Sequence, residues 1–311
     1  MTTEAPATLD CLIVGGGPAG ITAAIYLARF HLRVRVVDAG NSRMLWIPCT
    51  HNHAGYPDGI SGEDLLAAMV EQARRYQVPI ESGRVMRVER DDDLFVTDWG
   101  QGAVAARMLL LATGIQNRRP QCDEALHAAA LAGGHIRYCP VCDGYEVTDK
   151  RVAVIGTGGR GVAAAVFLRS YTADITLIES DGPIELDSED RERAAAAGLT
   201  LIDGPATVVG IEDGRLLVET PSGRHAFDSA YPALGSDTNN ALAGELGAEL
   251  ANDACVVVDS RQRTTVPGLY AAGDIVQGLD QISHAMGEGG VAATTIRNDL
   301  SLRQPLLRTA A

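Results

Sequence analysis

Val14-Gly15-Gly16-Gly17-Pro18-Ala19-Gly20 is the stretch of sequence that decides the fold. An apolar run precedes it, a segment with the composition of a helix follows it, and a second apolar run then ends in Asp38. Strand, glycine turn, helix, strand and acid, in this order, form the unit that binds a dinucleotide. In such a unit Gly15 allows the tight turn, Gly17 lets the backbone approach the pyrophosphate, and Gly20 packs the helix against the strand.

The same unit occurs a second time, 141 residues further along the chain. The recurring positions are the three glycines and the closing acid, which reappear as Gly156, Gly158, Gly161 and Glu179. Apolar runs flank both copies in the same places, so each copy has the full context of a nucleotide-binding turn rather than the glycines alone. A single glycine-rich turn is weak evidence, but two complete copies predict two nucleotide-binding units.

Two polar segments with turn residues, 116–119 and 234–240, indicate where one domain interrupts the other. We therefore predict a discontinuous first domain over residues 1–117 plus 240–311, and an inserted domain over residues 118–239. The expected fold is α/β, with two Rossmann-like nucleotide-binding domains of three layers (ββα), the second inserted in the first.

Cys139-Pro140-Val141-Cys142-Asp143-Gly144 lies just before the second unit. Two thiols at this spacing readily close a disulfide, and the local backbone can lower the pKa of one of them. The other reading is half of a zinc site, but a structural site needs four ligands and the chain has no second pair at such spacing, so we predict no metal. Asp143 is a candidate general acid for a leaving thiolate, or else a turn residue.

Composition excludes several classes of partner. The chain of 311 residues has 40 Asp and Glu against 26 Lys and Arg, a net charge of −14, so neither nucleic acid nor an anionic membrane is expected to bind it. Because the N-terminus lacks a basic signal region and the longest apolar stretch is broken by glycines, we expect a cytoplasmic protein. The remaining cysteines, Cys11, Cys49, Cys122 and Cys255, are expected to be inert core thiols.

Taken together, the chain resembles the low-molecular-weight thioredoxin reductases over nearly its whole length. The matching motifs are the first glycine turn, Ala112-Thr113-Gly114, the Cys139-to-Gly144 motif, the second glycine turn, and Ala272-Gly273-Asp274 followed by Gln281. The resemblance implies that FAD occupies the discontinuous domain, that the inserted domain rotates during turnover, and that the protein is a homodimer. It also implies that Cys142 faces the flavin, that Cys139 attacks the partner disulfide, and that Asp143 is the acid.

The resemblance places Asp274 on the ribityl chain, Gln281 and Ile282 beside the flavin ring, and Asn52 near the flavin. The whole expected FAD site comprises Gly15, Gly17, Pro18, Ala19, Gly20, Asp38, Asn52, Ala112, Thr113, Gly114, Gly273, Asp274, Gln281 and Ile282. The second nucleotide site comprises Gly156, Gly158, Gly161 and Glu179.

Three departures from the family make this chain a divergent member. The family's Gly-Gly-Gln-Leu stretch near the flavin is replaced within residues 41–48, and Asp280 stands where an arginine is usual. The basic cluster that holds the 2′-phosphate of NADPH is missing, since residues 179–190 contain acids and no Lys or Arg. The second site is therefore expected to disfavour NADPH and to take NADH or a second FAD, because Glu179 suits a free ribose hydroxyl in either ligand.

These observations favour a disulfide oxidoreductase that relays electrons from a reductant through FAD and the Cys139/Cys142 dithiol to a thioredoxin-like protein or another disulfide substrate. Two alternatives stay open: an FAD-dependent oxidase that uses oxygen to oxidise a small dithiol, and a two-flavin or ferredoxin-driven variant that uses no NAD(P)H. A redox-sensing flavoprotein without catalytic function is the remaining hypothesis.

Overall fold

The structure is a computed structural model that describes residues 8–100, 102–303 and 305–307. Contacts divide the chain into two compact units. The first contains the residues up to Leu45, Glu63–Gln116 and the residues from Thr238 onward, and the second contains Trp46–Gly62 and Asn117–Asp237. The division drawn from the sequence differs from this grouping mainly in Trp46–Gly62, which it assigned to the FAD domain.

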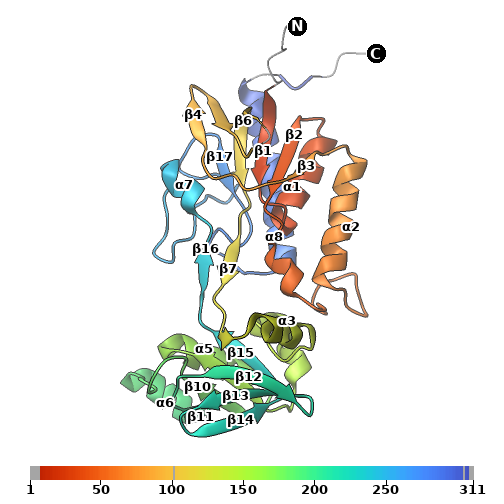
Figure 1. The fold of residues 1–311 in the computed structure, drawn as a ribbon. Helices are drawn as coiled ribbons and strands as arrows, with labels where there is room; N and C mark the ends of the chain where they lie inside the picture. The colour runs from red at the N-terminus through yellow and green to blue at the C-terminus, as the bar shows by residue number, and fades with distance from the viewer. Residues whose placement is uncertain (1–7, 101, 304, 308–311) are drawn as a thin grey trace. The chain divides into compact units, whose positions relative to one another are not determined.

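A seven-stranded sheet forms the centre of the first unit (Figure 1). Its order is β3-β2-β1-β6-β5-β4, with β17 also paired to β6. The strands are β1 Leu9–Val14, β2 Val34–Asp38, β3 Ile80–Ser82, β4 Glu89–Asp91, β5 Leu94–Thr97, β6 Val104–Leu111 and β17 Leu269–Ala271. Pairing is parallel among β3, β2, β1, β6 and β17, and antiparallel from β6 through β5 to β4.

The helices of the first unit are α1 Pro18–Arg29, α2 Gly62–Arg75, α7 Ala241–Glu245 and α8 Ile282–Arg303, with a short 3-10 helix η1 at Arg43–Trp46. Helices α1 and α8 lie side by side (Figure 1). Glycine makes this close approach possible, because a Cβ at Gly289 of α8 would overlap the carbonyl oxygen of Ala19 in α1.

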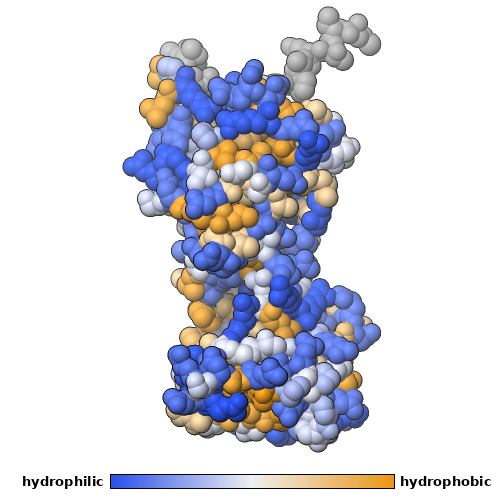
Figure 2. Space-filling model, turned by 90° about the vertical axis from the view of Figure 1, so that its left-hand side faces the viewer, coloured by the Kyte–Doolittle hydropathy of each residue, from blue (hydrophilic) through white to orange (hydrophobic). Residues whose placement is uncertain are grey.

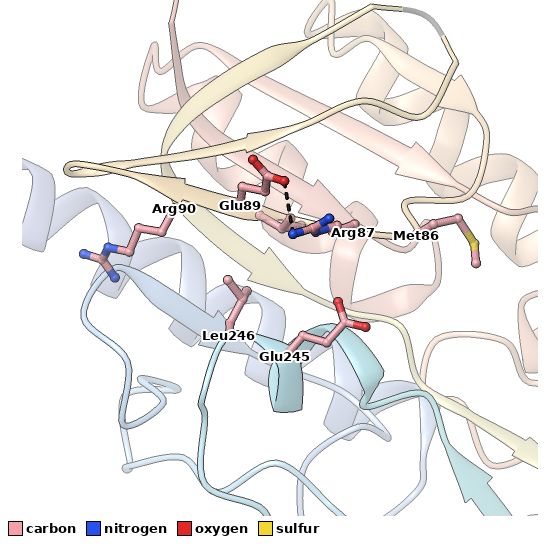
Figure 3. A pocket seen from close by; sticks show the side chains of 7 residues that line it. Met86, Arg87, Glu89, Arg90, Glu245 and Leu246 are labelled. Carbon is pink, nitrogen blue, oxygen red and sulfur yellow. Dashed lines mark ion pairs between the residues drawn. The ribbon is translucent and has the colours of Figure 1, made fainter.

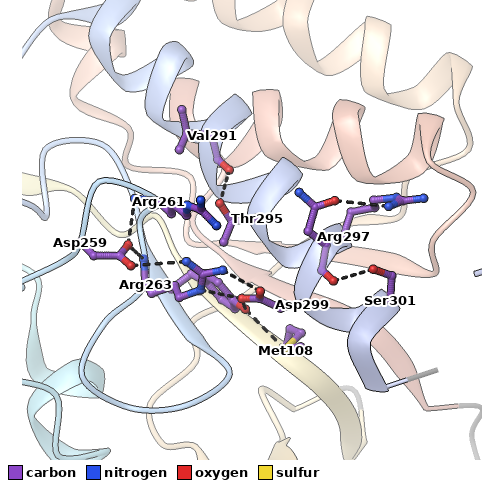
Figure 4. A network of polar contacts seen from close by, with 11 residues as sticks. Met108, Asp259, Arg261, Arg263, Val291, Thr295, Arg297, Asp299 and Ser301 are labelled. Atoms are coloured by element: carbon purple, nitrogen blue, oxygen red, sulfur yellow. Dashed lines mark hydrogen bonds and ion pairs between the residues drawn. The ribbon is translucent and has the colours of Figure 1, made fainter. Parts of the chain in front are cut away.

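An ion-pair network fastens β17 to α8 (Figure 4). Arg263 donates to both carboxylate oxygens of Asp299, at 2.7 and 2.6 Å, and the Tyr270 hydroxyl donates to the same carboxylate at 2.7 Å. These hydrogen bonds hold the pKa of Asp299 below its usual range, so the carboxylate stays charged. Because β17 ends at the expected FAD site, the network fixes the strand that leads to that site.

The second unit contains two four-stranded sheets, β11-β10-β9-β15 and β14-β13-β12-β8. The strands are β8 Gln121–Cys122, β9 Val152–Gly156, β10 Ile175–Ile178, β11 Thr200–Ile202, β12 Thr207–Glu212, β13 Arg215–Thr220, β14 Gly223–Phe227 and β15 Ser229–Ala233. The helices are α3 Glu124–Ala132, α4 Pro140–Asp143, α5 Gly158–Leu168 and α6 Ser188–Ala196, with the 3-10 helix η2 at Gly144–Val147.

Alternation along β9 builds the three layers of this unit. Val152 and Val154 pack into a core with Val162 and Leu168 of α5. The residues between them, such as Ile155, pack into a separate core shared with the second sheet. Because successive side chains of a strand point to opposite faces, one strand serves both cores. Parallel sheets with crossover helices in both units confirm the predicted α/β fold class.

The two passages between the units pair with each other, as β7 Ile115–Asn117 and β16 Ser236–Thr238. They coincide with the two polar segments singled out in the sequence. On the face shown in Figure 2, apolar residues form separate groups among hydrophilic ones.

An open hollow of about 840 Å³ lies in the first unit (Figure 3). Its lining consists of Met86, Arg87, Val88, Glu89, Arg90, Glu245 and Leu246. Arg87 and Glu89 form an ion pair across 3.3 Å there. None of the lining residues belongs to a glycine turn or to the cysteine motif, so we assign the hollow no role.

Candidate active site

The first glycine turn joins β1 to α1 in a conformation that requires glycine. Gly15 has φ +108°, and a Cβ there would overlap the carbonyl oxygen of Ala112. A Cβ on Gly20 would overlap the carbonyl oxygen of Gly15. Gly17 precedes α1 and offers no side-chain cap, so the first amides of the helix can donate to another acceptor. This is the cradle for a phosphate that the sequence predicts.

Asp38, the last residue of β2, lies against this turn. Its Oδ1 accepts a hydrogen bond of 3.0 Å from the amide of Gly16. A Cβ on Gly16 would meet the Asp38 carboxyl group at 2.6 Å. The acid and the turn are therefore in contact, which is compatible with the ribose-binding role predicted for Asp38.

Segments far apart in the sequence meet at the same edge of the sheet. Val14, Leu111 and Ala271 are in register at the carboxyl ends of β1, β6 and β17. The turn at Gly15, the motif that begins with Ala112, and the motif that contains Gly273 follow these ends directly. The Thr113 hydroxyl donates to the Asn239 carbonyl at 2.7 Å, and Gly114 has φ +63°. Ligands of parallel α/β sheets bind at such an edge.

Behind this edge, α8 supports the loop after β17. The amide of Gly273 donates to Oε2 of Glu288 at 2.7 Å, and His284 lies 3.1 Å from the other oxygen of Glu288. Burial raises the pKa of the Glu288 carboxyl group. Gln281 and Ile282 stand at the start of α8, where the Gln281 carbonyl accepts from the amide of Ala285.

Asn52 belongs to Trp46–Gly62, the segment that groups with the second unit. Its Oδ1 accepts from the Thr50 hydroxyl at 2.9 Å, and Thr50 pairs with Ile60 in an isolated antiparallel bridge. In the same segment, the Trp46 ring packs on Tyr138 with centroids 5.4 Å apart. The guanidinium of Arg119 lies 4.7 Å above the Trp46 ring.

Cys139 and Cys142 form a disulfide, with Cα atoms 5.2 Å apart. Cys139 precedes the single turn α4, and its Sγ accepts a hydrogen bond of 3.1 Å from the amide of Cys142. An amide donor favours a thiolate over a thiol. Pro140 at the first position of the turn fixes the backbone between the two cysteines.

Asp143 is held by two side chains that the sequence does not single out. Arg137 donates to its Oδ2 at 3.1 Å, and the buried hydroxyl of Tyr231 donates to its Oδ1 at 2.9 Å. Burial raises the pKa of the Asp143 carboxyl group; Arg137 and the Tyr231 hydrogen bond lower it in opposition, and the nearby Glu146 raises it further. Asp143 is thus a partly desolvated acid that directly follows Cys142 in the chain.

Strand β15 sets the position of the cysteine motif. Ile136 pairs in parallel with Ala230, whose amide donates to the His135 carbonyl and whose carbonyl accepts from the Arg137 amide. Pro232 follows two residues later and has no amide hydrogen to continue this ladder. The chain therefore leaves the sheet after Arg137 and turns into α4, with Tyr231 at the point of departure.

The second glycine turn resembles the first at its third glycine but has its positive φ at the second glycine, Gly158, rather than at the first. Gly158 has φ +50°, and a Cβ on Gly161 would press against Gly156 at 3.2 Å and against Leu177 at 2.9 Å. Glu179 follows β10 and is buried, and its Oε1 accepts the amide of Ser180 at 3.0 Å. Burial raises the pKa of this carboxyl group.

The first arginines that follow Glu179 in the sequence form hydrogen bonds within their own segment. Arg191 donates to the carbonyl of Leu186 at 3.2 Å, and Arg193 donates to Asp190 at 2.9 Å. Asp190 itself lies against the turn, because a Cβ on Gly159 would meet its Oδ2 at 2.6 Å. Acidic side chains therefore lie at both the ribose end and the turn of the second site, and the turn itself also carries Arg160.

Comparison with known proteins places the chain in a family. The model of the family described as pyridine nucleotide-disulphide oxidoreductase matches residues 9–289. The chain belongs to this family. Membership implies FAD and a pyridine nucleotide site. The matches below also confirm the resemblance to low-molecular-weight thioredoxin reductases and the two Rossmann-like domains.

Curated relatives of this family member include a thioredoxin reductase of Listeria monocytogenes, 28% identical over 91% of this chain and 91% of the relative. An alkyl hydroperoxide reductase of Pseudomonas putida (its F subunit) is 30% identical over 99% of this chain. The chain spans 60% of the length of that relative. Among solved structures, thioredoxin reductase from Streptococcus pyogenes is 27% identical, with a TM-score of 0.84 over 96% of this chain and 100% of that one.

The residues of the first unit fit the FAD of this pyridine nucleotide-disulphide oxidoreductase family. The uncapped start of α1, the turn closed to any side chain at Gly15 and Gly20, and the acid at Asp38 are each present. In the part of the chain that the structure describes, no group of three or more metal-ligating side chains is found. Within the same residues, no helix is long and apolar enough to cross a membrane.

The cysteines outside the motif differ in accessibility. Cys11 is fully buried, and burial raises the pKa of its thiol far above the usual value. Cys122 and Cys255 are partly buried, and burial also raises the pKa of both thiols. Cys49 is exposed, so the expectation that all four are core thiols is wrong for this residue.

Proposed function

We propose that the chain is a dithiol–disulfide oxidoreductase that passes electrons from a reductant, by way of FAD, to the Cys139/Cys142 pair and on to a disulfide substrate. The observation that carries this proposal is the closed disulfide with a partly desolvated acid beside it, in a member of a disulfide oxidoreductase family. Bound FAD supplies the two-electron exchange that converts this disulfide into a dithiol.

Each residue of the motif has a distinct role in the proposed reaction. The Cys139 thiolate attacks the substrate disulfide, forms a mixed disulfide and releases one substrate sulfur as a thiolate. Cys142 then attacks Cys139, which restores the internal disulfide and releases the second substrate thiol. The hydrogen bond from the Cys142 amide to the sulfur of Cys139 supports Cys139 as the thiolate. Asp143 supplies a proton to a departing sulfur.

For the second nucleotide site we propose NADH as the reductant, with NADPH disfavoured. The carboxylate of Glu179 accepts the ribose hydroxyls of NADH, while a 2′-phosphate meets this acid and finds no Lys or Arg among residues 180–190. A second FAD presents the same ribose hydroxyls and is the alternative ligand. The relatives named above support a thioredoxin-like protein as the electron acceptor.

Trapping of the mixed disulfide tests the proposal. A Cys142→Ser variant keeps the attacking thiol and lacks the resolving one, so it should accumulate a covalent adduct with a thioredoxin disulfide analogue. Cys139→Ser, the matched control, should form no such adduct. Turnover is measured in parallel, both as NADH-dependent reduction of a thioredoxin disulfide and as hydrogen peroxide formed from a small dithiol.

The outcomes separate the candidate functions. NADH-dependent reduction together with the adduct supports the reductase. Rapid peroxide formation from the dithiol without reduction of the thioredoxin disulfide supports the oxidase. If Cys139→Ser still forms the adduct and still turns over, Cys139 is not the nucleophile.

A further inference from the structure

One guanidinium in the first unit bridges two carboxylates at the expected FAD site. Nη1 of Arg43 lies 3.1 Å from Oδ2 of Asp274 and 3.0 Å from Oδ2 of Asp280. Arg43 belongs to η1, Asp274 follows β17, and Asp280 precedes α8. The side chains of Arg43 and Asp274 are only 23% and 20% exposed, so water screens their interaction poorly.

Two departures from the thioredoxin reductase pattern therefore meet in space. The replaced stretch within residues 41–48 contributes Arg43, and the position usually occupied by an arginine contributes Asp280. The positive charge that the sequence lacks at position 280 is supplied across the site from position 43. The arginine at position 43 and the aspartate at position 280 are therefore best understood as a pair, because together they keep a cation beside Asp274.

The site needs such a cation. Asp274 is desolvated, and burial together with Asp280 raises the pKa of its carboxyl group, while Arg43 lowers it. The first turn of α1 is close to the same segment, because a Cβ on Gly17 would lie 3.5 Å from the Ser42 hydroxyl. A dinucleotide pyrophosphate at this turn would be a third anionic group next to two acids.

We propose that Arg43 is a cofactor-positioning residue that holds Asp274 and Asp280 in place. Its positive charge offsets the negative charges of these two acids and of the FAD pyrophosphate, near which the ribityl chain also binds. The ligand chemistry is that of an anionic dinucleotide. Arg43 makes the acidic pair compatible with that ligand, so FAD affinity depends on its charge. This role rests on FAD binding by the first unit and not on disulfide turnover.

FAD binding to the apoprotein tests the role of Arg43 without any catalytic assay. The full-length chain is stripped of FAD and titrated with FAD by flavin fluorescence and by calorimetry. Arg43→Gln should weaken FAD binding by about 10- to 100-fold, the effect of losing a hydrogen bond between charged groups. Arg75→Gln is the matched control, because Arg75 also pairs with an acid, Glu71, but lies exposed on α2. It should bind FAD as the wild type does.

A second substitution separates charge from simple tethering of η1. Asp280→Asn in the Arg43→Gln background removes one of the uncompensated acids, so it should restore most of the lost affinity. If Arg43 acted only by tethering η1, this change would not restore the FAD affinity. Increasing potassium chloride should weaken FAD binding to the wild type more steeply than to Arg43→Gln.

Equal FAD affinity of Arg43→Gln and the wild type overturns the inference, and so does a loss that Asp280→Asn does not reduce. Circular dichroism and the thermal midpoint of each apoprotein show whether the variants are folded. Should Arg43→Gln fail to fold, Arg43→Met, which also removes the charge, gives the same comparison with and without Asp280→Asn. Wild-type protein that binds FAD but reduces no disulfide contradicts the proposed function and leaves this inference standing.

Discussion

The carboxylate of Asp143 is under two opposing influences. Burial favours its protonated form, whereas Arg137 and the Tyr231 hydroxyl favour the charged form. Because burial is the larger effect, the pKa lies above that of an ordinary aspartate, and the residue can still carry a proton where an exposed aspartate has lost it.

This balance predicts a pH dependence for the flavin–dithiol exchange, in which Asp143 gives its proton to a departing sulfur. An acid donates only below its pKa, so the rate should fall as pH rises through the raised pKa of Asp143. Tyr231→Phe removes a hydrogen bond that stabilises the carboxylate, so it should move this fall to higher pH. Asp143→Asn should slow flavin–dithiol exchange by about a hundredfold or more and abolish the pH dependence.

Stopped-flow traces of the exchange between pH 4 and 9 supply the rates for this comparison. Tyr145→Phe is the matched control, because Tyr145 lies two residues after Asp143 and is 81% exposed. Its profile should coincide with that of the wild type. Identical profiles for Tyr231→Phe and the wild type would show that the hydroxyl does not govern Asp143.

Sequence reasoning reached some of these residues and missed others for a physical reason. The glycines and acids of both turns are set by local backbone geometry, so their spacing predicts them. Tyr231 lies 88 positions from Asp143, and Arg43 lies 237 from Asp280, and no periodicity connects such pairs. Only the folded chain shows these pairs. The one sequence signal is that residues 43 and 280 both depart from the family pattern, which suggests that one charge compensates for the other.

At the scale of elements, the contact between α1 and α8 determines which glycines of α8 can be replaced. A Cβ on Gly289 would overlap the backbone of Ala19, whereas a Cβ on Gly287 would meet nothing within 4 Å. Both residues are within the same helix. They form a matched pair in which helix propensity is equal and packing differs.

We predict opposite effects for the two alanine substitutions. Gly287→Ala should stabilise the protein by about 0.5–1 kcal/mol, because alanine favours the helix. Gly289→Ala should destabilise it by about 1–3 kcal/mol and weaken FAD binding, since α8 must move away from α1 and the glycine turn. Thermal and denaturant unfolding of the apoproteins measure both. A stabilising Gly289→Ala would mean that the helices have room to separate.

Strand elements show how far the fold could be predicted. Each nucleotide-binding unit was predicted from its strand, turn and helix pattern, and the observed parallel pairing of β1 with β2 and of β9 with β10 confirms it. The predicted three layers (ββα) include a second β layer, but the strands of the sheet β14-β13-β12-β8 were not located from the sequence. Short turns without a distinctive sequence motif connect β12, β13 and β14. Strand β8 ends 85 residues before β12 begins. Such pairing depends on the shared core and leaves little local signal.

For the molecule as a whole, the acidic second site predicts a choice of reductant. Anaerobic titration with NADH should bleach the flavin absorbance. NADPH should need a concentration at least about tenfold higher, because a 2′-phosphate would face Glu179 and residues 180–190 contain no Lys or Arg. Glu179→Gln should narrow this difference. Efficient bleaching by micromolar NADPH would contradict the prediction, and two FAD released per chain would identify the second ligand as flavin rather than NADH.

The unequal accessibility of the cysteines gives the protein a built-in chemical record of its oxidation state. With the disulfide closed, Cys49 is the exposed thiol among the described residues, while Cys11 is sealed in the core. Burial raises the pKa of the Cys122 and Cys255 thiols, so both should react slowly near neutral pH. Brief alkylation at that pH, followed by intact-mass measurement, should therefore add one label to the oxidised chain and three after reduction, with Cys49→Ser lowering each count by one. The number of labels would then report, in a crude cell extract and without purification, what fraction of the chains carried electrons at the moment of quenching.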